Sequence, residues 1–246
     1  MLLEMYLKEY LYINIFAIHS IMSTTNMFKP SMRQTQADTP NSFVQEKEKQ
    51  NETSEDIQVL EKWDDMSLPD EVLRGIFSYG YEDPSPIQKR AISPMLNNRD
   101  LIAQAQSGTG KTATFSIGSM SGIDLSQNNV QVLCLSPTRE LAMQTATVYR
   151  GIGGFLDGLK VYLLVGGDSV DDNIRALKRD TPHVVIGTPG RVFDMLRRRA
   201  LMTKRIRTFI LDEADEMLSH GFKEQVHDIF EQLPEDVQTC IFSATM

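Results

Sequence analysis

The chain alternates between short apolar runs and longer segments with helical spacing of apolar residues. From residue 100 onward the apolar runs are bounded by polar or glycine-rich turns, which is typical of strands covered on both faces. We place these strands at about 100–104, 130–135, 160–165, 183–187, 207–211 and 238–242. Strands that alternate with helices predict an α/β fold with a doubly wound, mostly parallel sheet and helices on both faces.

Two further helices are predicted before the first strand. Apolar residues at helical spacing predict one helix from Pro69 to Ser78, which stops at Gly80. Two prolines then predict an extended loop that includes Gln88, followed by a second helix over 89–96. Ordered structure is expected to begin near residue 63.

Residues 1–60 form an N-terminal extension that we expect to be mostly disordered. Residues 23–58 are rich in polar and charged side chains and poor in apolar ones, so folding would not repay the entropy of ordering them. Residues 1–22 are apolar but lack the basic start of a signal peptide. An amphipathic helix, a targeting signal, or translated sequence upstream of a start at Met22 or Met27 remain open.

Composition indicates a soluble intracellular protein. The hydrophobic content of 41% is ordinary, and the net charge of −8 argues against a broadly basic coat for nucleic acid. Residues 41–65 alone hold eight acids against three lysines, so the rest of the chain is nearly balanced. Cys134 and Cys240 lie in apolar runs, which favours buried thiols in a reducing compartment over a disulfide framework or a zinc site. No apolar run reaches the length of roughly 18 residues that a membrane span needs.

The segment after the first predicted strand has the pattern of a phosphate-binding loop. Gly108 and Gly110 allow the backbone to turn with its N–H groups inward, and the helix that begins at Lys111 directs its positive end to the same place. Lys111 can reach the terminal phosphates, and the Thr112 hydroxyl can hold Mg²⁺. Ala105 stands where the usual pattern has glycine, but a small residue still allows close approach. The alternative is a glycine-rich turn without a ligand.

The other polar or glycine-rich turns also follow directly after predicted strands. They are Ser136–Glu140, Gly166–Gly167, Thr188–Arg191, Asp212–Asp215 and Ser243–Thr245. In a doubly wound sheet, ligands bind beyond the carboxyl ends of the strands. A single working surface at that edge therefore accounts for all these segments.

Two acids and one amide give this surface a specific chemistry. Asp212 at the tip of a buried strand is suited to hold Mg²⁺, and Glu213 can orient or deprotonate an attacking water. Acids at the start of a helix also have a simpler explanation, since they complement the helix dipole. The Gln88 amide can read the edge of adenine, with the Tyr81 ring stacked on the base. Together with the phosphate loop, the acids favour ATP hydrolysis.

These motifs resemble, in order and spacing, the first RecA-like lobe of the DEAD-box RNA helicases. The wider sequence is most similar to the translation initiation factor 4A branch, with its exon-junction and ribosome-biogenesis relatives. The resemblance covers about residues 61–246. It divides them into a Q-motif region at 61–89 and an ATP-binding RecA-like lobe at 90–246.

The resemblance implies roles for residues at matching positions. The adenine nucleotide would be bound by Trp63, Tyr81, Gln88, Ala105, Gln106, Ser107, Gly108, Thr109, Gly110, Lys111 and Thr112. The catalytic residues would be Glu213, Lys111 and Asp212, and the Mg²⁺ ligands would be Thr112 and Asp212. The RNA backbone would be contacted by Pro137, Thr138, Arg139, Gly166, Gly167, Thr188, Gly190 and Arg191. The residues that couple the two sites would be Asp215, Ser243 and Thr245.

The function implied by the resemblance is that of an ATP-dependent RNA helicase, an RNA-dependent ATPase with ATP and Mg²⁺ as cofactors. Its partners would be RNA, bound independently of sequence, and a scaffold protein with helical repeats, in the cytoplasm or the nucleus. The family continues beyond the position of Met246 into a second lobe that supplies arginine fingers. We therefore expect this chain to be a fragment or truncated form with weak activity. The alternative is a non-enzymatic single-lobe module that binds ATP and RNA.

Overall fold

Six parallel strands form the centre of the structure, a computed structural model that describes residues 58–219 and 221–244. The strands are β1 (Leu101–Gln104), β2 (Val132–Leu135), β3 (Val161–Leu164), β4 (Val184–Gly187), β5 (Thr208–Leu211) and β6 (Gln238–Ser243). Their order in the sheet is β1-β6-β5-β2-β4-β3, and every neighbouring pair is parallel. The predicted α/β fold is confirmed. Most of the predicted disordered extension, residues 1–57 of 1–60, lies outside the described residues. Thr245 also lies outside them.

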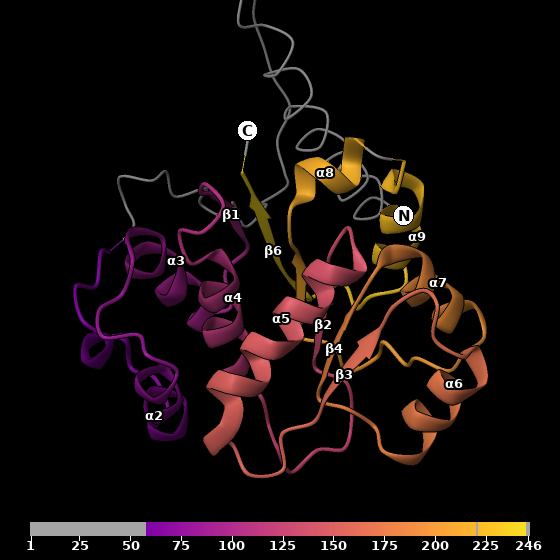
Figure 1. Cartoon of the computed structure of the whole chain (residues 1–246), viewed down its shortest axis with the longest axis horizontal. Helices are drawn as coiled ribbons and strands as arrows, with labels where there is room; N and C mark the ends of the chain where they lie inside the picture. The colour runs from indigo at the N-terminus through magenta and orange to yellow at the C-terminus, as the bar shows by residue number, and fades with distance from the viewer. Residues whose placement is uncertain (1–57, 220, 245–246) are drawn as a thin grey trace, which may run out of the picture. The chain divides into compact units, whose positions relative to one another are not determined.

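Helices lie on both faces of this sheet (Figure 1). After the strands come α4 (Lys111–Met120), α5 (Arg139–Ile152), the 3₁₀ turn η2 (Gly153–Phe155), α6 (Val170–Arg179), α7 (Pro189–Arg197), α8 (Ala214–Ser219) and α9 (Lys223–Phe230). Before β1 come the 3₁₀ turn η1 (Trp63–Met66), α2 (Asp70–Ser78) and α3 (Pro86–Leu96). No helix in the described ranges is both long enough and apolar enough to cross a membrane.

Successive side chains of each strand point to opposite faces, so the sheet separates two hydrophobic clusters. Cys134 and Ile210 belong to the cluster beneath α2 to α5. Leu135 and Leu211, one residue further along the same two strands, belong to the cluster beneath α6, α7 and α9. This alternation fixes which side chains share a face where the strands end.

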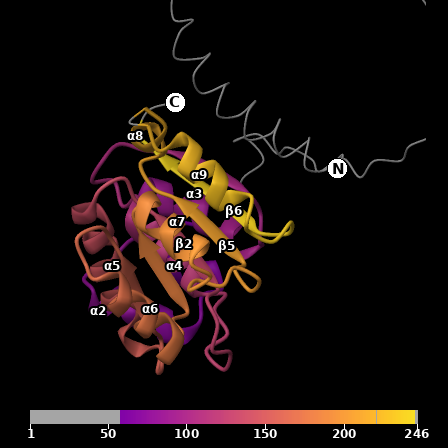
Figure 2. The ribbon, with the colours of Figure 1, turned by 90° about the vertical axis from the view of Figure 1, so that its right-hand side faces the viewer.

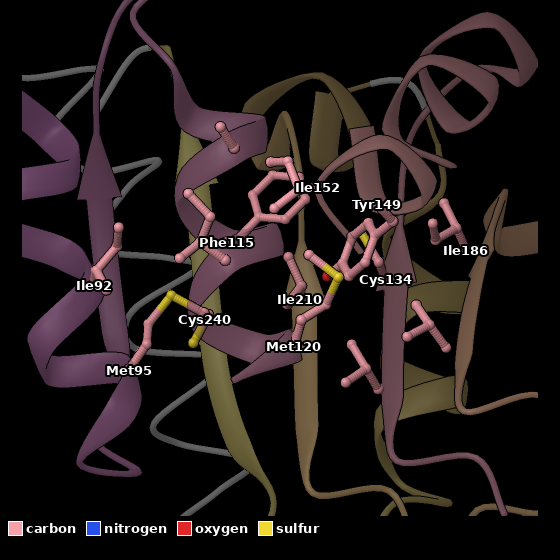
Figure 3. Close-up of a cluster of buried hydrophobic side chains, with 14 of the residues drawn as sticks. Ile92, Met95, Phe115, Met120, Cys134, Tyr149, Ile152, Ile186, Ile210 and Cys240 are labelled. Carbon is pink, nitrogen blue, oxygen red and sulfur yellow. The ribbon is translucent and has the colours of Figure 1, made fainter. Parts of the chain in front are cut away.

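The first cluster is built on aromatic residues from three elements. The Phe115 ring lies 5.2 Å from the Phe242 ring and 6.4 Å from the Tyr149 ring, measured between centroids. Figure 3 shows Phe115 and Tyr149 between α4, α5 and the sheet, with the two free cysteines, Cys134 and Cys240, among the apolar side chains. The predicted burial of both cysteines is confirmed.

The second cluster holds α7 and α9 against the opposite face. Val192 and Met195 of α7 and Val226 and Ile229 of α9 are buried there. Figure 2 shows α8 and α9 beside β5 and β6. Because α7 starts at the carboxyl end of β4, its last turn lies toward the amino ends of the strands.

The segment before β1 differs from the prediction at α3. The predicted extended loop ends at Ser85, and the helix begins at Pro86 instead of Lys89, so Gln88 lies in its first turn. Proline at the first helical position has the φ angle that a helix needs, and Ser85 with Gln88 forms a capping box. Gln88 is therefore a buried helical residue and not part of an extended loop.

Candidate functional site

The predicted phosphate loop joins β1 to α4 at the carboxyl edge of the sheet. Gly108 and Gly110 have φ angles of +80° and +98°, in the left-handed region that glycine adopts without strain. A Cβ on Gly110 would also lie 2.8 Å from Nε2 of Gln88. The first N–H groups of α4, from Lys111 onward, have no acceptor within the helix. The loop therefore has the backbone geometry of an anion site.

Lys111 contacts an acid that lies 102 residues further along the chain. Its Nζ donates to Oε2 of Glu213 at 3.1 Å and lies 3.1 Å from Oε1 as well. The Lys111 side chain is 5% exposed and that of Glu213 is 18% exposed, so the pair is largely shielded from water. The fold thus brings the predicted phosphate-binding cation and the predicted catalytic acid into direct contact.

Asp212 lies beside this pair at the end of β5. It is 4% exposed, and its Oδ1 accepts a hydrogen bond from the Glu213 N–H at 3.1 Å. Burial, and next the Glu213 carboxylate, raise the pKa of Asp212 to about 7, although the Lys111 charge opposes the shift. Glu213 has a φ of +48°, which is uncommon for a residue with a side chain and is typical of functional sites.

These residues fit a divalent cation. When Asp212 is ionised, two carboxylates lie near a single ammonium group, so the cluster of Lys111, Asp212 and Glu213 then carries excess negative charge that a divalent cation would neutralise. Within the described residues, Oδ2 of Asp212 has no hydrogen-bond donor. The half-buried Thr112, at the second position of α4, adds a hydroxyl on the loop side. Carboxylate and hydroxyl oxygens are the ligands that Mg²⁺ prefers.

Gln88 contacts the phosphate loop directly. Its Oε1 accepts from the Ser85 N–H at 2.7 Å, and its Nε2 donates to the Gly110 carbonyl at 3.5 Å. An amide has two N–H groups and two lone pairs, so one of each remains available to a base. The Tyr81 ring is half-buried and lies 5.4 Å from the Tyr79 ring, and burial raises the pKa of its hydroxyl.

Trp63 does not offer a stacking surface in this structure. It is 2% exposed and packs in the hydrophobic cluster beneath α2 to α5. Its Nε1 has no acceptor among the described residues. The other predicted nucleotide-binding residues belong to the phosphate loop and are exposed or half-buried. They are Ala105, Gln106, Ser107 and Thr109.

The predicted RNA-binding residues lie further along the same edge. Thr138 caps α5, because its hydroxyl accepts from the Leu141 N–H at 3.2 Å. Arg139 donates to the Gly166 carbonyl and lies 3.9 Å from Asp168. A Cβ on Gly167 would collide with the Arg139 guanidinium, and the φ of +90° also favours glycine there.

Arg191 is held from two sides. Its Nη1 donates to the Asn173 side chain and its Nη2 to the Asp168 carbonyl, the latter at 2.9 Å. Asn173 is 3% exposed and donates to the Tyr162 hydroxyl at 3.2 Å. Sequence reasoning missed Asn173 and Asp168, because neither lies in a motif with recognisable spacing. Their contacts exist only where α6 and α7 approach each other.

The other predicted residues lie at the same edge with different exposure. Pro137 is buried, Thr188 precedes α7 and is half-buried, and Gly190 is exposed in its first turn. Asp215 lies on α8, which packs against β6, and Ser243 is the buried last residue of β6. Apart from Trp63 and Tyr81, the structure places the predicted site residues that it describes at or beside the carboxyl edge. Gln88 of α3 reaches this edge through its contact with Gly110, whereas Tyr81 lies between α2 and α3.

The comparisons with known proteins agree with this arrangement. The DEAD/DEAH box helicase family matches residues 85–246. The chain is 53% identical over 189 residues to eukaryotic initiation factor 4A of Caenorhabditis elegans, covering 77% of this chain and 46% of that protein. It is 50% identical over 195 residues to eukaryotic initiation factor 4A-III homolog A of Oryza sativa, covering 79% of this chain and 48% of that protein. The chain thus spans about half the length of the curated relatives it matches.

Solved structures show the same fold. A DEAD box protein from Methanococcus jannaschii superposes with a TM-score of 0.73 at 36% identity, covering 76% of this chain and 51% of that one. Dbp5 of Saccharomyces cerevisiae, bound to RNA and ADP BeF3, superposes with a TM-score of 0.70 at 38% identity, covering 75% and 46%. The family match includes the phosphate loop, the acids after β5 and the arginines of the same edge. This chain therefore belongs to the DEAD/DEAH box helicase family.

Proposed function

We propose that this chain binds ATP with Mg²⁺ and the RNA backbone at the carboxyl edge of its sheet. In the whole protein, this lobe would serve an ATP-dependent RNA helicase that couples hydrolysis to remodelling of RNA duplexes or ribonucleoproteins. The observation that carries the proposal is the contact between Lys111 of the phosphate loop and Glu213, with Asp212 beside them. These three groups serve three distinct tasks in phosphoryl transfer.

Each group has a defined task at the nucleotide. Lys111 and the N–H groups of the first turn of α4 bind phosphate oxygens. Thr112 and Asp212 would hold Mg²⁺, which supplies positive charge to the phosphate oxygens as the γ-phosphoryl group leaves. Glu213 orients the attacking water, which requires it to release Lys111. Gln88 and Tyr81 would contact the adenine.

RNA binding is supported by groups that recognise phosphates without reading bases. Arg191 and Arg139 are fixed by their contacts with Asn173, Gly166 and Asp168, so little side-chain entropy is lost when a phosphate binds. The related Dbp5 structure contains RNA and ADP BeF3. Residence in cytoplasm or nucleus and a scaffold partner with helical repeats remain predictions from the family resemblance.

Displacement of a fluorescent ADP analogue from the 246-residue chain tests nucleotide binding. We expect Mg²⁺-dependent binding that Lys111→Ala abolishes and that Lys204→Ala, at an exposed lysine before β5, leaves unchanged. ATP should compete better than GTP, because the Gln88 amide matches the donor and acceptor of adenine. Unchanged affinity in Lys111→Ala would refute the assignment of the phosphate loop.

RNA binding is tested by fluorescence anisotropy with a labelled single strand at several salt concentrations. Arg191→Ala should weaken binding to all sequences alike and reduce the slope against salt by about one. Arg205→Ala, an exposed arginine before β5 and thus toward the other edge of the sheet, is the matched control. Equal losses in the two variants would indicate unspecific charge attraction instead of a site.

A further inference from the structure

Ser136 carries a buried hydroxyl that the roles described so far do not use. The residue follows β2 directly, is 0% exposed, and its Oγ has no hydrogen-bond partner among the described residues. Buried polar groups are nearly always hydrogen-bonded, because losing water without a replacement costs free energy. The unpaired Ser136 hydroxyl at this edge of the sheet therefore points to a hydrogen bond that forms when the site binds its ligand.

The sheet register places Ser136 next to Asp212. Leu135 of β2 pairs with Leu211 of β5, and the Asp212 N–H donates to the Leu135 carbonyl at 3.0 Å. The next residues along the two strands are Ser136 and Asp212. By the alternation of side chains, both belong on the face of Cys134, which is also the face of α4 and its phosphate loop.

The surroundings of the Cys134 thiol agree with a shared face for the two side chains. Burial raises its pKa most, the Asp212 carboxylate raises it further, and the Ser136 hydroxyl lowers it. Both groups therefore lie on the side of the sheet that carries this thiol. Among the described residues, Oδ1 of Asp212 accepts from the Glu213 N–H and no donor contacts Oδ2, so the Ser136 hydroxyl and an open acceptor lie at the ends of neighbouring strands.

We propose that Ser136 is a positioning residue for Asp212: its hydroxyl donates to Oδ2, directly or through one water, and fixes the carboxylate in the orientation that binds Mg²⁺. The inference rests on the proposed function, since it assumes that Asp212 serves the ion. Residues that hydrogen-bond to metal ligands restrict the ligand's rotation, and their loss typically weakens metal affinity about 10- to 100-fold. A serine whose hydroxyl has only a thiol, a weak hydrogen-bonding group, beside it is suited to this task.

Titration with MgCl₂ of the 246-residue chain, bound to a fluorescent ADP analogue, measures the effect without relying on hydrolysis. Ser136→Ala should raise the Mg²⁺ midpoint about 10-fold. Ser116→Ala is the matched control, because Ser116 of α4 is equally buried and its Oγ also has no partner among the described residues. Thermal unfolding of both variants should stay close to the parent chain, since each substitution removes one buried hydroxyl that has only a weak partner.

The substitution Asp212→Asn separates this inference from the proposed function. If Asp212→Asn leaves the Mg²⁺ dependence unchanged, the assignment of Asp212 as the metal ligand fails, and the role of Ser136 fails with it. If Asp212→Asn raises the midpoint but Ser136→Ala does not, only the inference about Ser136 is overturned. A coupled pair predicts that Ser136→Ala adds no further shift in the Asp212→Asn background. A full additional shift there would also overturn the inference.

Discussion

Neutralising Glu213 should increase the affinity of the chain for nucleotide. In the structure, the Glu213 carboxylate forms an ion pair with Lys111, the residue that we propose binds the phosphates. Bound nucleotide and Glu213 therefore compete for one ammonium group. The substitution Glu213→Gln keeps the size of the side chain and an acceptor oxygen but removes the charge, so Lys111 becomes easier to detach.

The magnitude follows from the geometry and exposure of the pair. A hydrogen bond to a charged group contributes about 1.5–3 kcal/mol, whereas an exposed ion pair contributes about 0–1 kcal/mol. With Lys111 5% exposed and Glu213 18% exposed, an intermediate value of about 1–2 kcal/mol applies. Since 1.4 kcal/mol corresponds to a factor of ten, nucleotide affinity should rise about 5- to 30-fold.

Displacement of a fluorescent ADP analogue at fixed Mg²⁺ measures this change, with hydrolysis followed in parallel. Glu213→Gln should bind more tightly and lose turnover, because the water is no longer oriented. Glu140→Gln is the control, since it removes one exposed carboxylate from the first turn of α5 at the same edge and tests the general effect of charge. Unchanged or weaker affinity in Glu213→Gln, or an equal gain in Glu140→Gln, would show that the ion pair does not oppose binding.

Three further predictions concern the phosphate loop, a buried histidine and an arginine of the proposed RNA surface. Gly110→Ala should lower the free energy of unfolding by about 1–3 kcal/mol in urea titrations, because its φ is +98° and the new Cβ would lie 2.8 Å from Nε2 of Gln88. Burial, and next a nearby lysine, lower the pKa of His183, so the folded chain binds this proton less readily than the unfolded chain. Stability should therefore fall as the pH drops below about 6.5, the ordinary histidine value, and the urea midpoint of His183→Gln should lose part of this dependence. Asn173→Ala removes the side-chain acceptor of Arg191 and should weaken RNA binding about 5- to 10-fold in anisotropy titrations, and an unchanged affinity would contradict the positioning role.

The sequence predicted the elements and the edge of the sheet at which they act. Apolar runs identified all six strands, because a strand buried on both faces is distinguishable from its polar turns. Gly108 and Gly110 marked the loop, since the left-handed backbone they adopt is a local property. Because the carboxyl ends of parallel strands lie at one edge of a sheet, the motifs could be assigned to that edge before the order of the strands was known.

Contacts between distant segments could not be predicted in this way. The strand order, with β1 beside β6, depends on pairing across the whole domain. The burial of Trp63 and the helical position of Gln88 depend on packing and capping that a loop pattern does not reveal.

The sequence by itself determined the phosphate loop, the acids and the arginines, because their chemistry is a property of residue type and local spacing. Only the tertiary structure decided that Lys111 pairs with Glu213, that Asn173 holds Arg191, and that Ser136 lies beside Asp212. These contacts join strands and helices whose register is set by the packing of two hydrophobic clusters. A shift of one residue in that register would turn Ser136 and Asp212, which follow β2 and β5, to the opposite face, so their proximity belongs to the fold and not to any single motif.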